Sequence, residues 1–331
     1  MKLPVSAKYI PLLASVFVLV VLYTLGCISF EKFGSLRVLV NLVGDNAFLG
    51  VAAVGATFVI LSGGIDLSVG SVVAFTSIFI ATIVERWQIN PLVAIAMALF
   101  LGALFGTAMG CLIQWFELPP FLVTLAGMFL ARGMGFMVHP ESLGIKHIFF
   151  LRTITQDLSL PLTAQVSVPF TAACFGFVFL AAVIVAHYTR FGRYIYALGG
   201  EEHSARLMGL PVARTKILTY TVSGFCSALA GVVYTFYTQS GDPTACVGLE
   251  LDAIAAVVIG GTLLSGGAGF MAGTAMGVVI LGLIQTLVTF QGNLNTWWTR
   301  IVVGLLLLAF ILLQNMVASA SGRMGAPART G

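Results

Sequence analysis

Long apolar runs recur along the whole chain and restrict its fold more than any other feature. A helix needs about 20 mainly apolar residues to cross the hydrocarbon of a bilayer, and such runs follow one another from Ile10 to Val317. Hydrophobic residues make up 59% of the sequence and charged residues only 8%, whereas about a quarter of the residues in soluble proteins are charged. Strands of a membrane barrel would be about ten residues long with alternating polarity. The sequence therefore predicts an all-α, polytopic membrane bundle.

The apolar runs and the polar breaks between them predict about ten transmembrane segments. The third and eighth are short enough to be broken or re-entrant elements. The first follows Lys2 and Lys8 and lacks a small-residue cleavage site, so we interpret it as a retained helix and not as a signal peptide. The predicted segments are 9–30, 38–61, 66–84, 91–115, 119–138, 168–188, 217–239, 251–264, 270–290 and 299–317.

We expect a single transmembrane domain over residues 1–331, built from two internally similar halves. The first half covers about 9–138 and the second about 217–317. Between the two halves lie a mainly polar segment at about 139–167 and a basic segment at about 189–216.

Lysine and arginine predict the orientation in the membrane. The positive-inside rule places short basic loops in the cytoplasm, and six predicted crossings precede the segment 189–216 while four follow it. Both termini are then cytoplasmic and the segment 139–167 is external. Lys32 and Arg37 oppose this orientation, and Glu31 partly offsets them. The residues that support it are Lys2, Lys8, Arg190, Arg193, Arg206, Arg214, Lys216, Arg323 and Arg329.

A glycine-containing polar segment interrupts the hydrophobic sequence twice. The first glycine segment, residues 59–71, reads Val-Ile-Leu-Ser-Gly-Gly-Ile-Asp-Leu-Ser-Val-Gly-Ser. The second glycine segment, residues 264–274, is a fainter copy, because a shift of 203 positions places 61–64 on the Leu-Ser-Gly-Gly of 264–267. Broken helices at corresponding places in two halves indicate a transport path, since their freed backbone groups line a cavity.

Close helix packing is the alternative role for the glycines. Small residues four positions apart let membrane helices approach each other. Glycines with this spacing are Gly102, Gly106, Gly110, Gly269, Gly273 and Gly277.

Asp66 is the most informative charge, because a carboxylate within the hydrocarbon costs roughly 2.5–3.5 kcal/mol and is a functional candidate by default. Two interpretations remain open for it. The carboxylate contacts substrate or a gate, or it caps free N–H groups at the start of a half-helix. The candidates for the substrate path are Asp45, Asn46, Ser62, Gly63, Gly64, Asp66, Ser68, Ser265, Gly266 and Gly267.

Polar residues near the outer ends of two segments suggest a vestibule. Asn41 and Asp45 are four residues apart on one helical face, and Glu250 and Asp252 open the eighth segment at nearly the corresponding position. The alternative is that these residues lie at the membrane interface and are solvated there.

Several classes of chemistry are absent from the sequence. The five cysteines stand singly and the four histidines have no metal-ligand spacing, so neither a metal site, a disulfide framework nor a catalytic constellation is predicted. No Gly-x-x-x-x-Gly-Lys-Ser/Thr loop is present, so any ATP must be hydrolysed by another subunit. No basic aromatic segment suggests nucleic-acid binding. We expect this chain to bind no cofactor.

The basic segment contains a predicted short helix from Glu201 to Met208, between Gly199-Gly200 and Gly209. It is either a solvated connector or a docking helix for a cytoplasmic partner. The docking candidates are Glu201, Glu202, Ala205, Arg206 and Gly209.

Three motifs resemble those of one transporter family, and they follow one another along the chain in the same order as in that family. They are 58–71, the stretch Phe-Gly-Arg-Tyr-Ile-Tyr-Ala-Leu-Gly-Gly at 191–200, and 251–267. The chain resembles the permease subunits of bacterial ABC importers for ribose, xylose, arabinose and related sugars. Within that family, 45–50, 250–255 and 295–299 most resemble a permease of galactofuranose importers.

The resemblance implies an inner-membrane permease that works by alternating access. It implies a periplasmic sugar-binding protein, a second permease, membrane lipid and an ATPase subunit that uses ATP and Mg²⁺ and moves a coupling helix at 201–209. Similar galactofuranose permeases favour a heterodimer, whereas ribose-type permeases form homodimers. Glu201-Glu202 departs from the family, whose members often have asparagine after Gly-Gly.

Three other functions stay open. A permease for branched-chain amino acids or nucleosides is the nearest, although a substrate with fixed charges should require more buried opposite charges than the sequence contains. A secondary transporter or a membrane-embedded enzyme is a more distant alternative.

Overall fold

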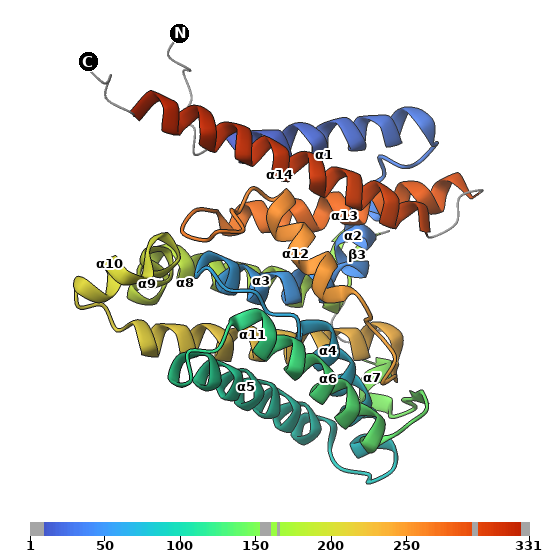
Figure 1. Cartoon of the computed structure of the whole chain (residues 1–331). Coiled ribbons are helices and arrows are strands. Elements are labelled where there is room, and N and C mark those ends of the chain that lie inside the picture. The colour runs from blue at the N-terminus through green and yellow to red at the C-terminus, as the bar shows by residue number, and fades with distance from the viewer. Residues whose placement is uncertain (1–9, 153–159, 164–165, 293–296, 326–331) are drawn as a thin grey trace, which may run out of the picture.

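The computed structural model describes residues 10–152, 160–163, 166–292 and 297–325, and these form a helical bundle (Figure 1). Each of the ten predicted segments contains a helix, which confirms the all-α membrane bundle. The helices are α1 (Ile10–Ser29), α2 (Leu36–Asp45), α3 (Ala47–Leu61), α4 (Val69–Glu85), α5 (Pro91–Trp115), α6 (Pro120–Val138), α7 (Ile148–Arg152), α8 (Phe170–Tyr188), α9 (Arg190–Gly200), α10 (Glu202–Leu207), α11 (Val212–Thr238), α12 (Leu249–Ile259), α13 (Met271–Gln291) and α14 (Trp297–Gly325). The strands are β1 (Leu143–Gly144), β2 (Leu160–Thr163), β3 (Val166–Val168) and β4 (Ser240–Gly241).

Seven helices within the described residues are long and apolar enough to cross a membrane singly. The second predicted segment is a bent pair, in which α2 and α3 meet at 55°. The break lies at Asn46, whose side-chain amide donates to the Leu42 carbonyl at 2.9 Å. Gly282 on α13 leaves room for this buried amide, because a methyl group there would lie 2.6 Å from its nitrogen.

The third and eighth segments are half-helices, as their short apolar runs predicted. With a rise of about 1.5 Å per residue, the 17 residues of α4 and the 11 of α12 fall short of a hydrocarbon core of about 30 Å. The first turn of each helix has a buried side, which contains Val69 and Gly70 of α4 and Leu249 and Glu250 of α12, whereas Leu251 of α12 is exposed. Their N-terminal ends are therefore available to the interior.

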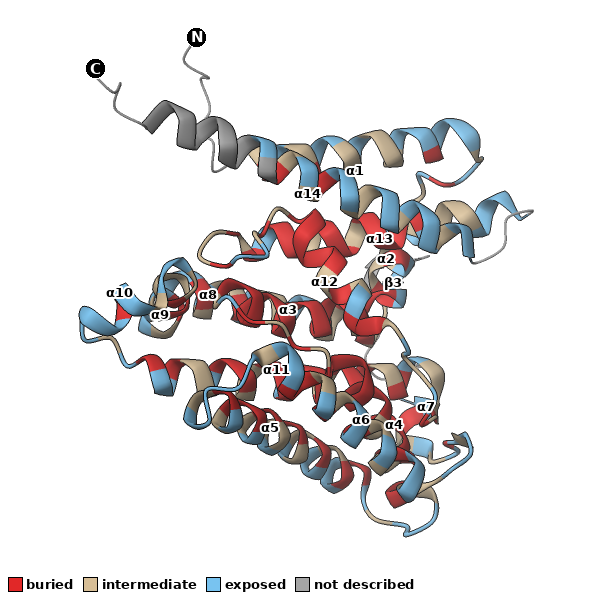
Figure 2. Ribbon diagram, viewed as in Figure 1, coloured by how far each residue is buried: buried red, intermediate tan, exposed pale blue. Residues whose placement is uncertain are grey.

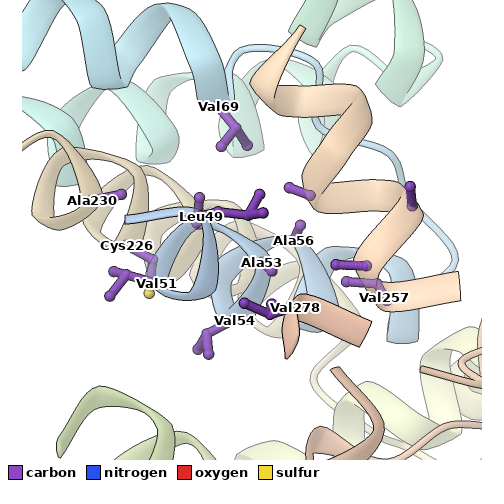
Figure 3. Close-up of a cluster of buried hydrophobic side chains, with 14 of the residues drawn as sticks. Leu49, Val51, Ala53, Val54, Ala56, Val69, Cys226, Ala230, Val257 and Val278 are labelled. Carbon is purple, nitrogen blue, oxygen red and sulfur yellow. The ribbon is translucent and has the colours of Figure 1, made fainter. Parts of the chain in front are cut away.

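The core lies around α3, α4, α11 and α12, where most side chains are buried (Figure 2). Figure 3 shows small apolar residues of α3, such as Val51 and Ala53, packed beside Cys226 of α11 and Val257 of α12. By contrast, many large apolar side chains of α1, α5 and α14 are exposed, as expected of helices in contact with lipid.

Close helix packing is confirmed at the spaced glycines that lie within α5 and α13, whereas Gly269 precedes α13 and meets the Thr262 side chain. A methyl group at Gly102 would lie 2.7 Å from the carbonyl oxygen of Gly224 on α11, and one at Gly110 would lie 2.9 Å from the Cα of Ile217. Gly273 and Gly277 contact the backbone of α12 in the same way, at Gly260 and Ala256.

The two ends of the bundle differ in structure. The start of α1, the end of α14 and the helices α9 and α10 lie at one end, which we call the α10 end (Figure 1). The opposite α7 end contains the segment after α6, where β1 pairs with β4 in an antiparallel arrangement. The predicted basic loop 189–216 is mostly helical, since α9 fills its first part and α11 already begins at Val212. Lys2, Lys8, Arg329 and residues 153–159 lie outside the described residues.

Candidate substrate path and coupling site

Asp66 lies between the first glycine segment's turn and the start of α4, and only 3% of its surface is exposed. Ser68 donates its backbone N–H and its hydroxyl to Oδ1 at 2.9 and 2.7 Å. The Ser223 hydroxyl on α11 donates to Oδ2 at 2.7 Å. The carboxylate closes an Asx-turn before α4 and ties it to α11, and these bonds offset the cost of its burial. It does not cap the free N–H groups inside α4.

A second carboxylate, Glu250, lies where the N-terminal ends of α4 and α12 meet. Its Oε2 touches Gly70 in the first turn of α4, and a methyl group at Gly70 would also lie 2.6 Å from the Cys246 carbonyl. Gly248 donates its N–H to Oε1 at 3.2 Å. Within the described residues, neither the buried Oε2 nor the Ser71 hydroxyl has a hydrogen-bond partner. The partial positive charge of two helix N-termini favours a carboxylate here.

The predicted outer vestibule is therefore wrong for Glu250. Asp252, two residues later, is partly exposed and forms a 2.7 Å ion pair with Arg300. The sequence pattern did not separate the two carboxylates, because it did not reveal that Glu250 faces Gly70 of α4 whereas Asp252 faces Arg300.

A cavity of about 470 Å³ opens at the α10 end. The first glycine segment contributes Ser62, Gly63 and Gly64 to its wall, and the coupling region contributes Glu202 and Arg206. The buried Tyr220 of α11 also lines it. The structure thus brings the first glycine segment and the predicted docking helix to one cavity.

The predicted docking residues have different environments. Glu202 accepts from Lys216 on α11 at 2.9 Å and from Arg206 at 3.3 Å, so it holds α10 against the bundle. Ala205 is buried on the inner face of α10, whereas Glu201 is exposed. Gly209 has a φ of 75° and ends the helix in the left-handed conformation that favours glycine.

Two exposed apolar residues of this region were missed from the sequence. Leu207 and Met208 are 76% and 67% exposed at the tip of α10. Their apolar character beside several charged residues was the available signal, but only the structure shows that they point away from the bundle while Ala205 points into it.

The second glycine segment packs against the first. Gly267 donates its N–H to the Leu61 carbonyl at 3.0 Å. Gly266 is buried and Ser265 is exposed. Ser62, Gly63 and Gly64 of the first segment therefore lie close to Ser265, Gly266 and Gly267 of the second at the α10 end, whereas Asp66 and Ser68 lie deeper, at the start of α4.

Asp45 and Asn46 lie in a different place, beside a cavity of about 490 Å³ at the α7 end. Uncharged polar and aromatic side chains dominate its wall, and Asp45 is the one formal charge among the described residues that line it. A smaller cavity of about 100 Å³ shares Asn46 and Gln285 with it and includes the Asp252–Arg300 pair. The other polar or aromatic lining residues of the larger cavity are Asn41, Phe48, Tyr237, Gln285, Thr286, Thr289 and Phe290.

Among the described residues, no group of three or more His, Cys, Asp or Glu side chains is placed to hold a metal ion. The polar groups gather in two cavities at opposite ends, with buried carboxylates between them. This is an arrangement for binding and passage.

Comparison with known proteins identifies the family. A family model described as "Branched-chain amino acid transport system / permease component" matches residues 38–311. The chain belongs to this permease family. The inner membrane ABC transporter permease protein YjfF of Escherichia coli K12 is 47% identical over 312 residues, which cover 93% of this permease and 92% of YjfF.

Two further relatives have named substrates. The fructose import permease protein FruG of Bifidobacterium longum is 39% identical and covers 95% of this permease, with 93% of its own length matched. The ribose import permease protein RbsC of Escherichia coli K12 is also 39% identical, with 91% of this permease and 92% of RbsC matched. No solved structure matches the chain.

Membership establishes the general role of the permease. It is a multi-pass inner-membrane subunit of an ABC importer and not an enzyme. Family membership implies an ATPase subunit, which uses the ATP, and a substrate-binding protein as its partners.

Proposed function

We propose that the permease imports an uncharged monosaccharide, with a galactofuranose-type sugar favoured. The observation that supports this most is the α7-end cavity, in which amides and hydroxyls surround a single carboxylate. Such groups hydrogen-bond sugar hydroxyls, and aromatic rings such as Phe48 and Tyr237 pack against the apolar face of a sugar ring. The fructose and ribose substrates named for two relatives support the same class.

Galactofuranose is favoured by the sequence resemblance at 45–50, 250–255 and 295–299. The first two of these stretches include Asp45 and Asn46 of the α7-end cavity and Glu250 of the interior. Asn295 and Thr296 lie outside the described residues.

The proposed mechanism is alternating access along the bundle. Sugar enters at the α7-end cavity, which faces a periplasmic binding protein, and leaves at the α10 end. Both termini are then cytoplasmic. The partner ATPase docks on α10, where the exposed Leu207 and Met208 insert into an apolar groove of that subunit. A second, different permease completes the path, and a homodimer is the alternative.

A test of the substrate uses the complete importer in proteoliposomes, with its binding protein outside and ATP inside. We expect ATP-dependent uptake of a labelled furanose sugar and no uptake of leucine or adenosine. Leucine uptake instead would support the activity named in the family description. Uptake that persists without ATP and collapses with the proton gradient would contradict an ATP-driven importer.

The docking surface has a separate test. Leu207→Asp should reduce co-purification of the ATPase, because a charge replaces an apolar contact. Lys146→Asp, a charge change at the α7 end, should leave co-purification unchanged. Equal recovery of the ATPase with both variants would place the docking surface elsewhere.

A further inference from the structure

Three backbone segments that are distant in the sequence meet at the α10 end. They are the end of α3, the last residues of α9 and the second glycine segment. We call their contact the glycine junction, which consists of Leu61, Gly63, Gly199, Gly200, Gly266 and Gly267. The hydrogen bond from Gly267 to the Leu61 carbonyl lies at its centre.

The junction has no room for a side chain at Gly199, Gly266 or Gly267. A methyl group at Gly199 would overlap the Leu61 carbonyl and lie 2.6 Å from the Gly267 nitrogen, so it would meet both atoms of the central hydrogen bond. A methyl group at Gly266 would lie 2.7 Å from the Gly63 nitrogen. Backbone in direct contact passes on a displacement, because no side chain is present to absorb it by changing rotamer.

The end of α9 and α10 form one packed unit. Glu201 donates its N–H to the Ala197 carbonyl at 3.3 Å across the break between the two helices. Ala205 of α10 packs with Leu198 of α9 and with Val212 at the start of α11. A shift of α10 therefore moves Gly199, which lies three residues before it.

On its other side, the junction reaches both half-helices. The chain leaves Leu61 through the turn at Gly63 and reaches α4 by way of Asp66. The second glycine segment follows α12 and leads into α13. One contact thus joins α10 to the two elements whose N-terminal ends meet at Glu250.

We propose that Gly199 is a positioning residue for transport, through which one movement of α10 displaces both glycine segments together. The proposal rests on the proposed function, in which the partner ATPase moves α10. It extends that function by naming the contact through which the movement reaches the interior.

The chain offers a matched pair of variants for the test. Gly199→Ala places a methyl group in the junction, whereas a methyl group at the neighbouring Gly200 has no atom within 4 Å. With Gly199→Ala, we expect the assembled complex to keep its basal ATPase activity. Sugar uptake and the ATPase activity stimulated by the loaded binding protein should fall about tenfold, a typical size for coupling between sites. Gly200→Ala should match the wild type.

The decisive quantity is the ratio of stimulated to basal ATPase activity at equal amounts of assembled complex. A purely structural defect lowers the amount of complex but leaves this ratio unchanged. Equal ratios in Gly199→Ala, Gly200→Ala and the wild type would overturn the proposal.

A cross-linking experiment tests the proposal if the Gly199→Ala complex does not assemble. Gly200→Cys and Ser265→Cys introduce thiols at exposed positions on two sides of the junction, and a short thiol cross-linker joins them. If the segments move together, the cross-linked importer keeps its uptake, as do the single-cysteine controls. Loss of uptake in the cross-linked double variant alone would show that the segments separate, which contradicts the proposal.

Uptake by the wild-type importer distinguishes failure of the proposed function from failure of the role of Gly199. If it takes up no sugar, the proposed function fails. If it takes up sugar while Gly199→Ala retains full coupling, only the role of Gly199 fails.

Discussion

The two glycine segments share a turn and differ in how they are anchored. Gly63 and Gly266 correspond under the shift of 203 positions, and both have a φ of 84°. In the first segment, the buried Asp66 ties the chain after the turn to α11 through Ser223. The second segment has Gly269 in the corresponding place, and its carbonyl accepts from the Tyr196 hydroxyl of α9 at 3.0 Å.

The flanking helices also differ in length, although the shorter helix precedes the turn in both copies. In the first copy, the 15-residue α3 precedes the turn and the 17-residue α4 follows it. In the second copy, the half-helix α12 precedes the turn and the 21-residue α13 follows it. The first segment is bonded to α11, and the second is bonded to α9, the helix that leads to α10. The same local sequence is thus anchored to a different helix in each copy.

The greatest loss of stability should follow from changing the anchor of the first segment. Asp66→Ala removes the acceptor of three hydrogen bonds, so we expect the free energy of unfolding to fall by about 3 kcal/mol. Thermal unfolding in detergent would measure this. Asp66→Asn keeps an acceptor for Ser68 and should cost less. If Asp66→Asn abolishes uptake at unchanged stability, the charge itself takes part in transport, and the first segment is more than an anchor.

The turns themselves should respond unequally to the same substitution. A left-handed φ costs alanine about 1–2 kcal/mol at either position. A methyl group at Gly63 has its nearest contact at 3.6 Å, whereas one at Gly266 would lie 2.7 Å from the Gly63 nitrogen. Gly266→Ala should therefore lower the unfolding temperature clearly more than Gly63→Ala. Equal shifts would show that the two turns are packed alike.

The anchor of the second segment should be weaker. Tyr196→Phe removes one hydrogen bond to the Gly269 carbonyl and keeps the ring, so we expect a loss of about 1 kcal/mol. Because Tyr196 belongs to α9, stimulated ATPase activity should also decrease relative to basal activity. A stability loss as large as that of Asp66→Ala would remove the proposed difference between the anchors.

The smallest effect is expected at the exposed serine of the second segment. Ser265→Ala changes a surface hydroxyl, so stability should stay within about 0.5 kcal/mol of the wild type. Uptake measurements would then report only on a contact with substrate. A strong decrease in uptake would place Ser265 on the path of the sugar.

Much of the fold was predictable because the length of an apolar run is a local property. Each predicted segment contains a helix, and the short runs at 66–84 and 251–264 correspond to the half-helices α4 and α12. The start of α11 was missed, since Arg214 and Lys216 suggested a loop. In the structure, Lys216 lies within the helix and pairs with Glu202.

The candidate site was predictable in part. The cost of a charge in the membrane identified Asp66, but its partner Ser223 is 157 residues away and left no signal nearby. Glu250 was assigned to the surface because the sequence does not show where α12 begins in space. Leu207 and Met208 were not distinguished from Ala205, because exposure on a short helix depends on the surface against which the helix packs.

From the sequence alone it follows that this protein is a helical membrane bundle with short third and eighth segments, and that it resembles one permease family. The break of the second segment at Asn46 was not predicted. Hydrophobic length and the backbone freedom of glycine depend only on nearby residues. The tertiary structure alone shows which glycines touch, which carboxylates are buried and where the first turns of α4 and α12 meet. Those properties depend on contacts between distant segments, and the packing of the whole bundle selects among the arrangements that the local sequence allows.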